Sequence, residues 1–531
     1  MNQPGARRRR AQGGHREVLV VGVDIGTGGC RAVVVAPEGA VLGSAQVAYP
    51  LLSPAPGVAE QDPRAILAAV LSTVREAIED ADRGRPGATC RSAVGAIALS
   101  SVFHSLVVVD RAGEPLTNLI TWADARSLPQ VRQLKAELDA DAIYRRTGCP
   151  LHPIYWPGKV RWFQESHPEL AARARKYLSI KDYVVHALTG EYAADLSVVS
   201  GSGLLNLTAR TWDTEVLLAC ALDPDRLPRL VPPAARLPLL PSAAHELGLE
   251  AGTELVVGAG DGVLANVGCG AVSAGMMALT IGTSGAVRLV TGEPKLDREG
   301  RTWCYLMDER LAVAGAAINN GGIVLRWLRD SFCEPQISEA ARLAIDPYEL
   351  LTSLAATVPP GAEGLLFLPF LAGERSPYWN AEARGVLCGL TLRHNRAHVA
   401  RATLEGIGFR IGSVYRALIE TAGEPAEIRA TGGFTRSPLW VQIIADLLGR
   451  EITLTEVDEG SAFGAALLGQ VALGIVPDLA SAARSVRLKP PVAPDPERHT
   501  YYRRLLDLFL ELYGQVSPSF PKLSAVSLSG P

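Results

Sequence analysis

A seven-residue segment that occurs twice is the feature of this sequence that most constrains its fold. Residues 23–29 read VDIGTGG, and residues 279–285 read LTIGTSG. Both copies are followed by an apolar β-type segment, at 32–35 and at 286–290. The recurrence of I-G-T-[GS]-G between strands in two halves of a chain indicates an internal structural repeat. Length agrees with two domains, because 531 residues exceed what one hydrophobic core supports.

The first copy predicts a strand, a glycine turn and a second strand. Rossmann and Walker A loops instead lead from a strand into a helix. The one Gly-Lys pair of the chain is followed by Val160 and does not form a Walker A motif. A turn of small residues still exposes backbone N–H groups that can bind phosphate. An ordinary hairpin is the alternative. The small turn residues considered as nucleotide contacts are Gly26, Thr27 and Gly28 in the first copy and Gly282, Thr283 and Ser284 in the second.

Two carboxylates lie beside these turns. Asp24 ends the first strand, where it could hold a hydrated Mg²⁺ against a phosphate. Asp261 interrupts an apolar, glycine-rich stretch just before the second copy. Asp261 could simply cap a helix that begins near Gly262. Two phosphate loops facing one nucleotide, with a carboxylate between them, instead favour phosphoryl transfer with Asp261 as the group that accepts the proton of the nucleophile.

Polar and aromatic side chains predict a pocket for a sugar or polyol. They follow or end predicted strands, and they are His104, Trp122, Asp124 and Arg126. Ligands bind at strand ends in open α/β sheets. A further glycine pair, Gly432 and Gly433, ends a predicted strand at 427–431, where a flat adenine could lie against the backbone. A plain strand-to-helix turn is the alternative there.

Composition indicates a soluble globular protein and excludes several classes. The net charge of −3 argues against nucleic acid as the main partner, and Arg7 to Arg10 lie in what we expect to be a disordered tail. The eight cysteines contain no C-x-x-C pair, so neither a disulfide framework nor a zinc site is predicted. No run of about 18 apolar residues occurs, so we expect a cytoplasmic protein without a membrane partner.

These features resemble the FGGY family of carbohydrate kinases, within the actin-like ATPase superfamily. The resemblance runs from about residue 18 to 513, and its most specific part is GVLCGL at 385–390 followed by His398, Val399 and ATLE at 402–405. The first family signature fits less well, because Trp156 stands where Pro, Ser or Thr is usual. The resemblance implies an α/β fold of two actin-like, ribonuclease H-like domains, each with a mixed central sheet flanked by helices, and an active site in the cleft between them.

The same resemblance implies roles for the residues named above. Asp261 would be the general base, and Asp24 would neighbour Mg²⁺. Thr27, Gly282 and Thr283 would contact the phosphates of ATP, and the glycine pair at 432–433 would belong to the adenosine site. The sugar side would include the four residues of the predicted pocket.

Within the family, the sequence resembles the gluconate kinase branch. The matching segments are FHSL at 103–106, PLT at 115–117, ITWADARS at 120–127 and NNGGIVLRW at 319–327. We therefore expect ATP-dependent phosphorylation of the terminal hydroxyl of D-gluconate, which gives 6-phosphogluconate. Arg126 is the first candidate for binding the carboxylate, since a guanidinium can donate two parallel hydrogen bonds. Kinases of xylulose or glycerol are the nearest alternatives, and a non-enzymatic actin-like sugar sensor is a more distant one.

The expected domain organisation follows from the repeat. An N-terminal domain at 17–265 would carry the sugar site, the first phosphate loop and Asp261. A C-terminal domain at 266–515 would carry the second phosphate loop and the adenosine site. Tails are expected at 1–16 and 516–531, and Pro-rich 227–241 is the best linker candidate. The oligomeric state is left open, with a homodimer as one option.

Overall fold

The N-terminal half of the chain folds around a six-stranded mixed sheet. The computed structural model describes residues 18–85, 89–456 and 460–528. In spatial order the strands are β13 (Arg236–Pro238), β14 (Glu254–Gly260), β5 (Val94–Ser101), β1 (Leu19–Ile25), β2 (Gly29–Val35) and β3 (Val41–Ala48). β1, β2 and β3 form the predicted antiparallel meander, and β5 and β14 continue the sheet in parallel with β1.

The C-terminal half repeats this arrangement in a second six-stranded sheet. Its order is β17 (Trp303–Leu306), β18 (Ala312–Ile318), β16 (Gly285–Thr291), β15 (Met276–Ile281), β21 (Glu427–Thr431) and β22 (Thr453–Leu454). The order β5-β1-β2-β3 of the first sheet thus corresponds to β21-β15-β16-β18 of the second. β15 and β16 form the hairpin around the second I-G-T copy, and β21 runs parallel to β15. The predicted internal repeat and two-domain α/β fold are confirmed.

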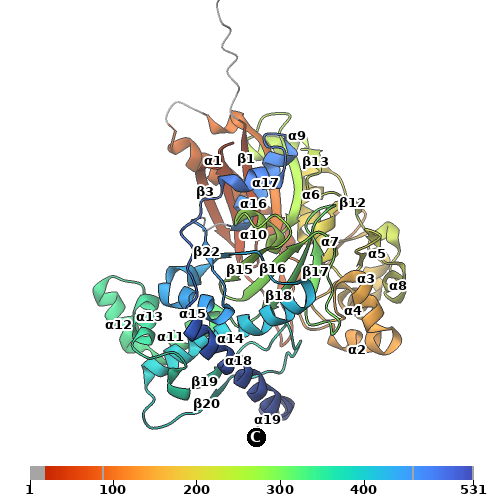
Figure 1. Ribbon diagram of the computed structural model, residues 1–531. Helices are drawn as coiled ribbons and strands as arrows, with labels where there is room; N and C mark the ends of the chain where they lie inside the picture. The colour runs from red at the N-terminus through yellow and green to blue at the C-terminus, as the bar shows by residue number, and fades with distance from the viewer. Residues whose placement is uncertain (1–17, 86–88, 457–459, 529–531) are drawn as a thin grey trace, which may run out of the picture.

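Helices cover the sheets because the central strands are apolar on both faces. Leu19, Val21 and Val23 of β1 belong to one core with α1 (Pro63–Arg83), whereas Val20 belongs to another with α10 (Asp261–Gly268) and α16 (Gly460–Ala472). The second sheet packs against α14 (Arg396–Ala422). Figure 1 shows blue α16 among the red and orange elements of the N-terminal half, so the chain returns there near its end.

The remaining elements surround this framework. In the N-terminal half they are β4 (Glu60–Gln61), β6 (Val107–Val109), β7 (Leu119–Ile120), α2 (Leu128–Glu137), α3 (Ala140–Thr147), α4 (Trp156–Ser166), α5 (Pro168–Arg173), β8 (Lys176–Leu178), α6 (Ile180–Thr189), β9 (Ala193–Asp195), α7 (Leu196–Ser200), β10 (Leu205–Asn206), β11 (Thr211–Trp212), α8 (Thr214–Ala219), β12 (Arg229–Val231) and α9 (Pro241–Leu247). In the C-terminal half they are α11 (Gly322–Phe332), α12 (Glu334–Leu343), α13 (Pro347–Ala356), β19 (Leu366–Leu368), β20 (Val386–Cys388), α15 (Pro438–Leu448), α17 (Leu479–Ala482), α18 (Pro496–Val516) and α19 (Phe520–Leu528).

Two segments differ from the sequence expectation. Residues 227–241 do not form a linker, because β12 pairs with β9 and β13 pairs with β14 at the edge of the first sheet. The expected tail from residue 516 instead contains α19, which begins at buried Phe520, whose ring lies 6.2 Å from that of Tyr513. Burial of this aromatic ring offsets the ordering of a Ser- and Pro-rich end. The expected tail at 1–16 lies outside the described residues.

All eight cysteines have free thiols, and Cys388 alone among them is exposed. Among the described residues, no helix has both the length and the hydropathy needed to cross a bilayer.

Candidate functional site

The strand register brings the two predicted carboxylates to one edge of the first sheet. Asp24 in β1 lies opposite Ser100 in β5, and Ser101 lies opposite Gly260 at the end of β14. The Ser100 hydroxyl donates a hydrogen bond of 2.6 Å to Oδ1 of Asp24. Asp261 follows β14 directly as the first residue of α10. Parallel strands therefore end together at the edge where α/β sheets bind ligands.

The glycines before Asp261 are required by packing. Gly258 has a φ of +78°, and a Cβ there would lie 1.6 Å from the carbonyl oxygen of Leu99. A Cβ on Gly260 would lie 2.0 Å from the ring of Phe103. These two glycines therefore let β14 approach β5 and the ring of Phe103 closely. Gly260 is the N-cap residue of α10, so Asp261 is not the cap.

Asp261 has an environment suited to proton transfer. Its Oδ1 accepts a hydrogen bond of 2.6 Å from the backbone N–H of Gly262. Burial and, to a smaller extent, the nearby charge of Asp24 raise the pKa of the Asp261 carboxyl to about 7, against the lowering effects of the Gly262 N–H, Arg288 and Arg375. A carboxyl group with a pKa near the working pH can accept a proton efficiently.

Asp261 lines a cavity between the two halves, which we call the central cavity. It encloses about 320 Å³. The wall residues come from both halves, and they are Thr27, Val102, Phe103, His104, Trp122, Asp261, Gly262, Ala265, Thr280, Ser284, Gly285, Ala286, Arg288, Trp303, Tyr305, Ala317, Arg375 and Ser461. The structure therefore brings five predicted site residues into one cavity: Thr27, His104, Trp122, Asp261 and Ser284. Trp122 and Thr27 are also directly joined, since Nε1 of Trp122 donates to Oγ1 of Thr27 at 2.9 Å.

His104 presents one ring nitrogen as an acceptor. Its Nδ1 lies 2.6 Å from the carbonyl oxygen of Gly201, which assigns the proton to Nδ1 and leaves Nε2 as the acceptor. Burial lowers the pKa of His104 to about 3, so the ring is neutral at physiological pH. Its backbone has a φ of +66°, and buried Lys159 donates to its carbonyl oxygen at 2.6 Å. Lys159 thus fixes a backbone conformation that a non-glycine residue rarely adopts.

Asp124 and Arg126 do not reach the central cavity, in contrast to the sequence expectation. Nε of Arg126 donates to Oδ2 of Asp124 at 2.9 Å, and a terminal nitrogen donates to Oε1 of Glu60 at 2.5 Å. The guanidinium also lies 4.3 Å from the ring centroid of Trp162. Asp124 additionally accepts from the backbone of Ala59. Nε and one terminal nitrogen of Arg126, a pair that could bind a carboxylate side by side, are therefore already used within the protein.

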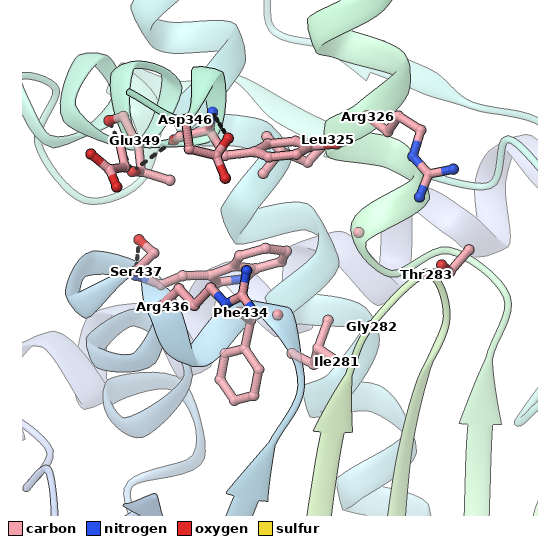
Figure 2. Close-up of a pocket in the computed structure, with 15 residues that line it drawn as sticks. Ile281, Gly282, Thr283, Leu325, Arg326, Asp346, Glu349, Phe434, Arg436 and Ser437 are labelled. Atoms are coloured by element: carbon pink, nitrogen blue, oxygen red, sulfur yellow. Dashed lines mark hydrogen bonds between the residues drawn. The ribbon is translucent and has the colours of Figure 1, made fainter. Parts of the chain in front are cut away.

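A second cavity, which we call the outer cavity, lies beside the C-terminal sheet and encloses about 330 Å³. Figure 2 shows Asp346 and Glu349 on one side of it, Phe434, Arg436 and Ser437 on the other, and Thr283 near one end. Of the predicted nucleotide contacts, Gly282, Thr283 and Gly433 line it. Gly432, with a φ of +101°, precedes Gly433 at the end of β21.

The turn between β15 and β16 separates the two cavities. Thr280 and Ser284 line the central cavity, whereas Ile281, Gly282 and Thr283 line the outer one. On the opposite half, Gly26, Thr27 and Gly28 form the matching turn between β1 and β2. Of these three, Thr27 is the one that lines a described cavity. A molecule in the outer cavity would therefore need to cross the β15–β16 turn to reach Asp261.

Several residues of this site were missed by the sequence interpretation. Arg288, Trp303 and Tyr305 line the central cavity and come from strands whose runs look like ordinary core. Arg375 also lines this cavity, and no motif of the sequence singled it out. Lys159 was not singled out as a site residue either, although a lysine among the buried residues of α4 is a usable signal.

Among the residues that the structure describes, no cluster of three or more His, Cys, Asp or Glu side chains could hold a metal ion by itself. A magnesium ion bound to nucleotide phosphates needs only one or two carboxylates and keeps several waters. Asp24 at the end of β1 fits that need.

Comparison with known proteins identifies the family. Residues 19–268 match the N-terminal domain of the FGGY family of carbohydrate kinases, and residues 277–473 match its C-terminal domain. The chain is 40% identical over 495 residues to the gluconokinase of Bacillus licheniformis, which covers 93% of this chain and 95% of that protein. It is 28% identical over 505 residues to the xylulose kinase of Escherichia coli, covering 94% and 99%.

A solved structure agrees with the sequence comparison. The gluconate kinase from Lactobacillus acidophilus superposes with a TM-score of 0.88 and 32% identity, covering 96% of this chain and 100% of that one. Both domains of the family are matched in order, and they span the two sheets and the cavities described above. The chain belongs to the FGGY family of carbohydrate kinases.

Proposed function

We propose that this protein is a gluconokinase, which transfers the γ-phosphoryl group of ATP to the terminal hydroxyl of D-gluconate and yields 6-phosphogluconate and ADP. The observation that carries the proposal is the 40% identity, over 93% of the chain, to a protein named gluconokinase. The 28% identity to a xylulose kinase makes xylulose the alternative substrate. A cavity that combines Asp261, neutral His104 and an arginine supports a polyhydroxy acid as the ligand.

The proposed reaction assigns a task to each side of the cleft. Asp261 accepts the proton of the terminal hydroxyl as that oxygen attacks the γ-phosphorus, and the bond between the γ-phosphorus and the β,γ-bridging oxygen breaks. Nε2 of His104 accepts a hydrogen bond from a substrate hydroxyl. Thr27 and Ser284 line the central cavity from different halves of the chain, and their hydroxyls can donate to phosphate oxygens.

ATP is assigned to the outer cavity. Its adenosine would lie between the α13 side, with Asp346 and Tyr348, and the α15 side, with Gly433. Its phosphates would then pass the β15–β16 turn at Thr283 towards Asp261. Mg²⁺, when bound to those phosphates, would supply positive charge against the transferred group, and Asp24 is the residue proposed to hold its hydration shell.

A substrate panel tests the proposed function. ADP release is measured with D-gluconate, D-xylulose and glycerol, and the gluconate product is oxidised by 6-phosphogluconate dehydrogenase to identify the position of phosphorylation. We expect the highest kcat/KM with gluconate. A gluconate rate no higher than the background hydrolysis of ATP would reject the substrate, and a higher kcat/KM for xylulose would make the alternative correct.

The pH dependence tests the state of Asp261. A general base must be deprotonated, so kcat/KM should fall as pH decreases below the pKa of about 7. Below that value the fall should approach tenfold per pH unit, with a plateau above it. An aspartate with an ordinary pKa near 3.9 would instead give full activity down to about pH 5. A profile that is flat between pH 5 and 8 would contradict the proposed base.

Substitution of Gly433 tests the nucleotide assignment. No atom lies within 4 Å of a Cβ built on Gly433, so valine fits the fold but extends into the outer cavity. We expect Gly433→Val to raise the KM for ATP by about tenfold, equivalent to about 1.4 kcal/mol, without changing the KM for gluconate. Gly292→Val is the matched control, because its Cβ also meets no atom and it does not line that cavity. Equal ATP KM values in the two variants would argue against the assignment.

A further inference from the structure

Arg375 is a cation in the central cavity with unused hydrogen-bond donors. Its guanidinium lies 5.3 Å from the ring centroid of Trp122, and its Nε is buried without a hydrogen-bond partner. One terminal nitrogen donates to the carbonyl oxygen of Ile318 at 3.5 Å, the outer limit for such a bond. Within the described part of the chain, no carboxylate lies within salt-bridge distance of this side chain.

The neighbouring Glu374 fixes the loop but does not neutralise Arg375. Oε1 of Glu374 accepts from the backbone N–H of Arg375 at 2.8 Å and from that of Asn319 at 2.9 Å. Its Oε2 accepts from Nε of fully buried Arg410 at 3.0 Å. The charge of Glu374 is therefore already paired with Arg410. The loop backbone is held firmly, while the guanidinium of Arg375 is left to face the cavity.

A cation such as Arg375, partly buried beside the central cavity without a charge partner among the described residues, requires a physical explanation. Burial disfavours a charged group unless an opposite charge and hydrogen bonds compensate for the lost hydration. Burial indeed lowers the pKa of Arg375. A buried charged side chain beside a cavity is typical of a binding site. A bound anion would compensate for the lost hydration of the guanidinium.

Arg288, the other arginine that lines the central cavity, already donates hydrogen bonds within the protein. Nε of Arg288 donates to Oδ1 of Asn266 at 3.0 Å, and a terminal nitrogen donates to Oγ1 of Thr280 at 2.7 Å. Both contacts fix Arg288, and its charge favours the ionised form of Asp261. Arg126 lies outside the cavity in its own ion-pair cluster. Arg375 is therefore the cation best able to receive a new anion.

We propose that Arg375 binds the carboxylate of the sugar acid and makes the enzyme prefer acids to neutral sugars, an inference that rests on the proposed gluconokinase function. A guanidinium donates two parallel hydrogen bonds to a carboxylate, in a geometry that an amide or a hydroxyl does not match. A neutral substrate would leave Arg375 unpaired and desolvated in the occupied cavity. Because the proposed acceptor is the hydroxyl at the other end of gluconate, Arg375 would set the orientation of the whole chain.

The test compares D-gluconate with D-gluconamide, which replaces the carboxylate by a neutral group of nearly the same shape. ADP release is measured for the unaltered protein, Arg375→Gln and Arg375→Lys. We expect the unaltered protein to favour gluconate in kcat/KM by about 10- to 100-fold, the range for a charge-assisted hydrogen bond. Arg375→Gln should remove most of this preference by raising the KM for gluconate. Arg375→Lys should reduce it several-fold, because an ammonium group lacks the planar fork.

Matched controls separate the outcomes. Arg126→Gln removes a guanidinium outside the cavity, so it should change the rates with both substrates by the same factor. The inference is overturned if Arg375→Gln lowers kcat/KM for both substrates by the same factor, which is the result expected if Arg375 contacts a phosphate or only packs. If Arg375→Gln does not fold, an unchanged preference in Arg375→Lys overturns it. If the unaltered protein phosphorylates another sugar but not gluconate, the proposed gluconokinase function itself is rejected. That outcome differs from a failure of the inference about Arg375, in which gluconate is still phosphorylated.

Discussion

Asp261→Asn is expected to lower turnover by about 10²- to 10⁴-fold, which is the usual cost of losing a general base. The amide keeps the shape of the carboxylate and can still accept from the N–H of Gly262, but it cannot take the proton of the attacking hydroxyl. ATP binding should remain, because Asp261 lines the central cavity and not the outer one. Single-turnover phosphoryl transfer and calorimetric titration with ATP measure the two properties separately.

The thermal stability of Asp261→Asn tests whether the carboxylate has a structural role. The pKa of Asp261 is raised in the folded protein to about 7, so between about pH 4 and pH 7 the folded state binds more protons than the unfolded state. The contribution of this group to stability is therefore present below pH 4 and is lost as pH rises towards 7. Asn carries no charge, so Asp261→Asn should be at least as stable as the parent at pH 8.

Two results would contradict the role of Asp261. Near-normal turnover would exclude it as the base, and a large fall in melting temperature at pH 8 would show that the carboxylate is instead structural. Asp330→Asn is the matched control, because Asp330 lies half-exposed on α11, paired with Arg329. The same chemical change there should leave turnover unaltered.

Glu374→Ala is expected to lower the free energy of unfolding by about 3–5 kcal/mol, the range for removing one partner of a buried ion pair. Glu374 and Arg410 have side chains with 0% exposure, and their contact is 3.0 Å. Removal of the carboxylate leaves the Arg410 guanidinium buried without its charge partner. The backbone N–H groups of Asn319 and Arg375 also lose their acceptor. Chemical denaturation of both proteins measures the difference.

The same variant should also impair activity, because the loop that carries Arg375 loses its anchor. Glu382→Ala is the matched control in the same loop, since Glu382 is exposed. Surface substitutions of this kind usually change stability by less than about 0.5 kcal/mol. If Glu374→Ala cost no more than the control, the Glu374–Arg410 pair would not be what organises this loop.

The sequence predicted the fold where local pattern and repetition coincide. β1 and β15 each combine an apolar, β-branched run with the same turn, so both hairpins were recognised. The short strand β8 is not recognisable in this way, because Tyr177 and Leu178 lie between the helices α5 and α6 and pair with the distant strand β6. Pairing between distant segments decided the outcome there, and helical periodicity carries no information about such partners.

The candidate site was predictable where a residue follows a strand directly. Asp24, Thr27, His104 and Asp261 lie at or just beyond the ends of β1, β5 and β14, and polar residues at the ends of such parallel strands converge. Trp122 instead follows β7, which lies in a separate antiparallel pair. That argument locates the backbone but not the direction of each long side chain. Arg126 was selected in this way, yet two carboxylates hold its guanidinium away from the cavity.

The sequence alone therefore determined the internal α/β repeat, the turns of its two copies and the carboxylates beside those turns. Only the tertiary structure decided which arginines line the central cavity. Arg375 lies more than 100 residues from Asp261 in the chain, and its loop is fixed by a buried pair with Arg410. Electrostatic complementarity depends on which charges are already paired in space, and that pairing is decided by packing between elements far apart in sequence.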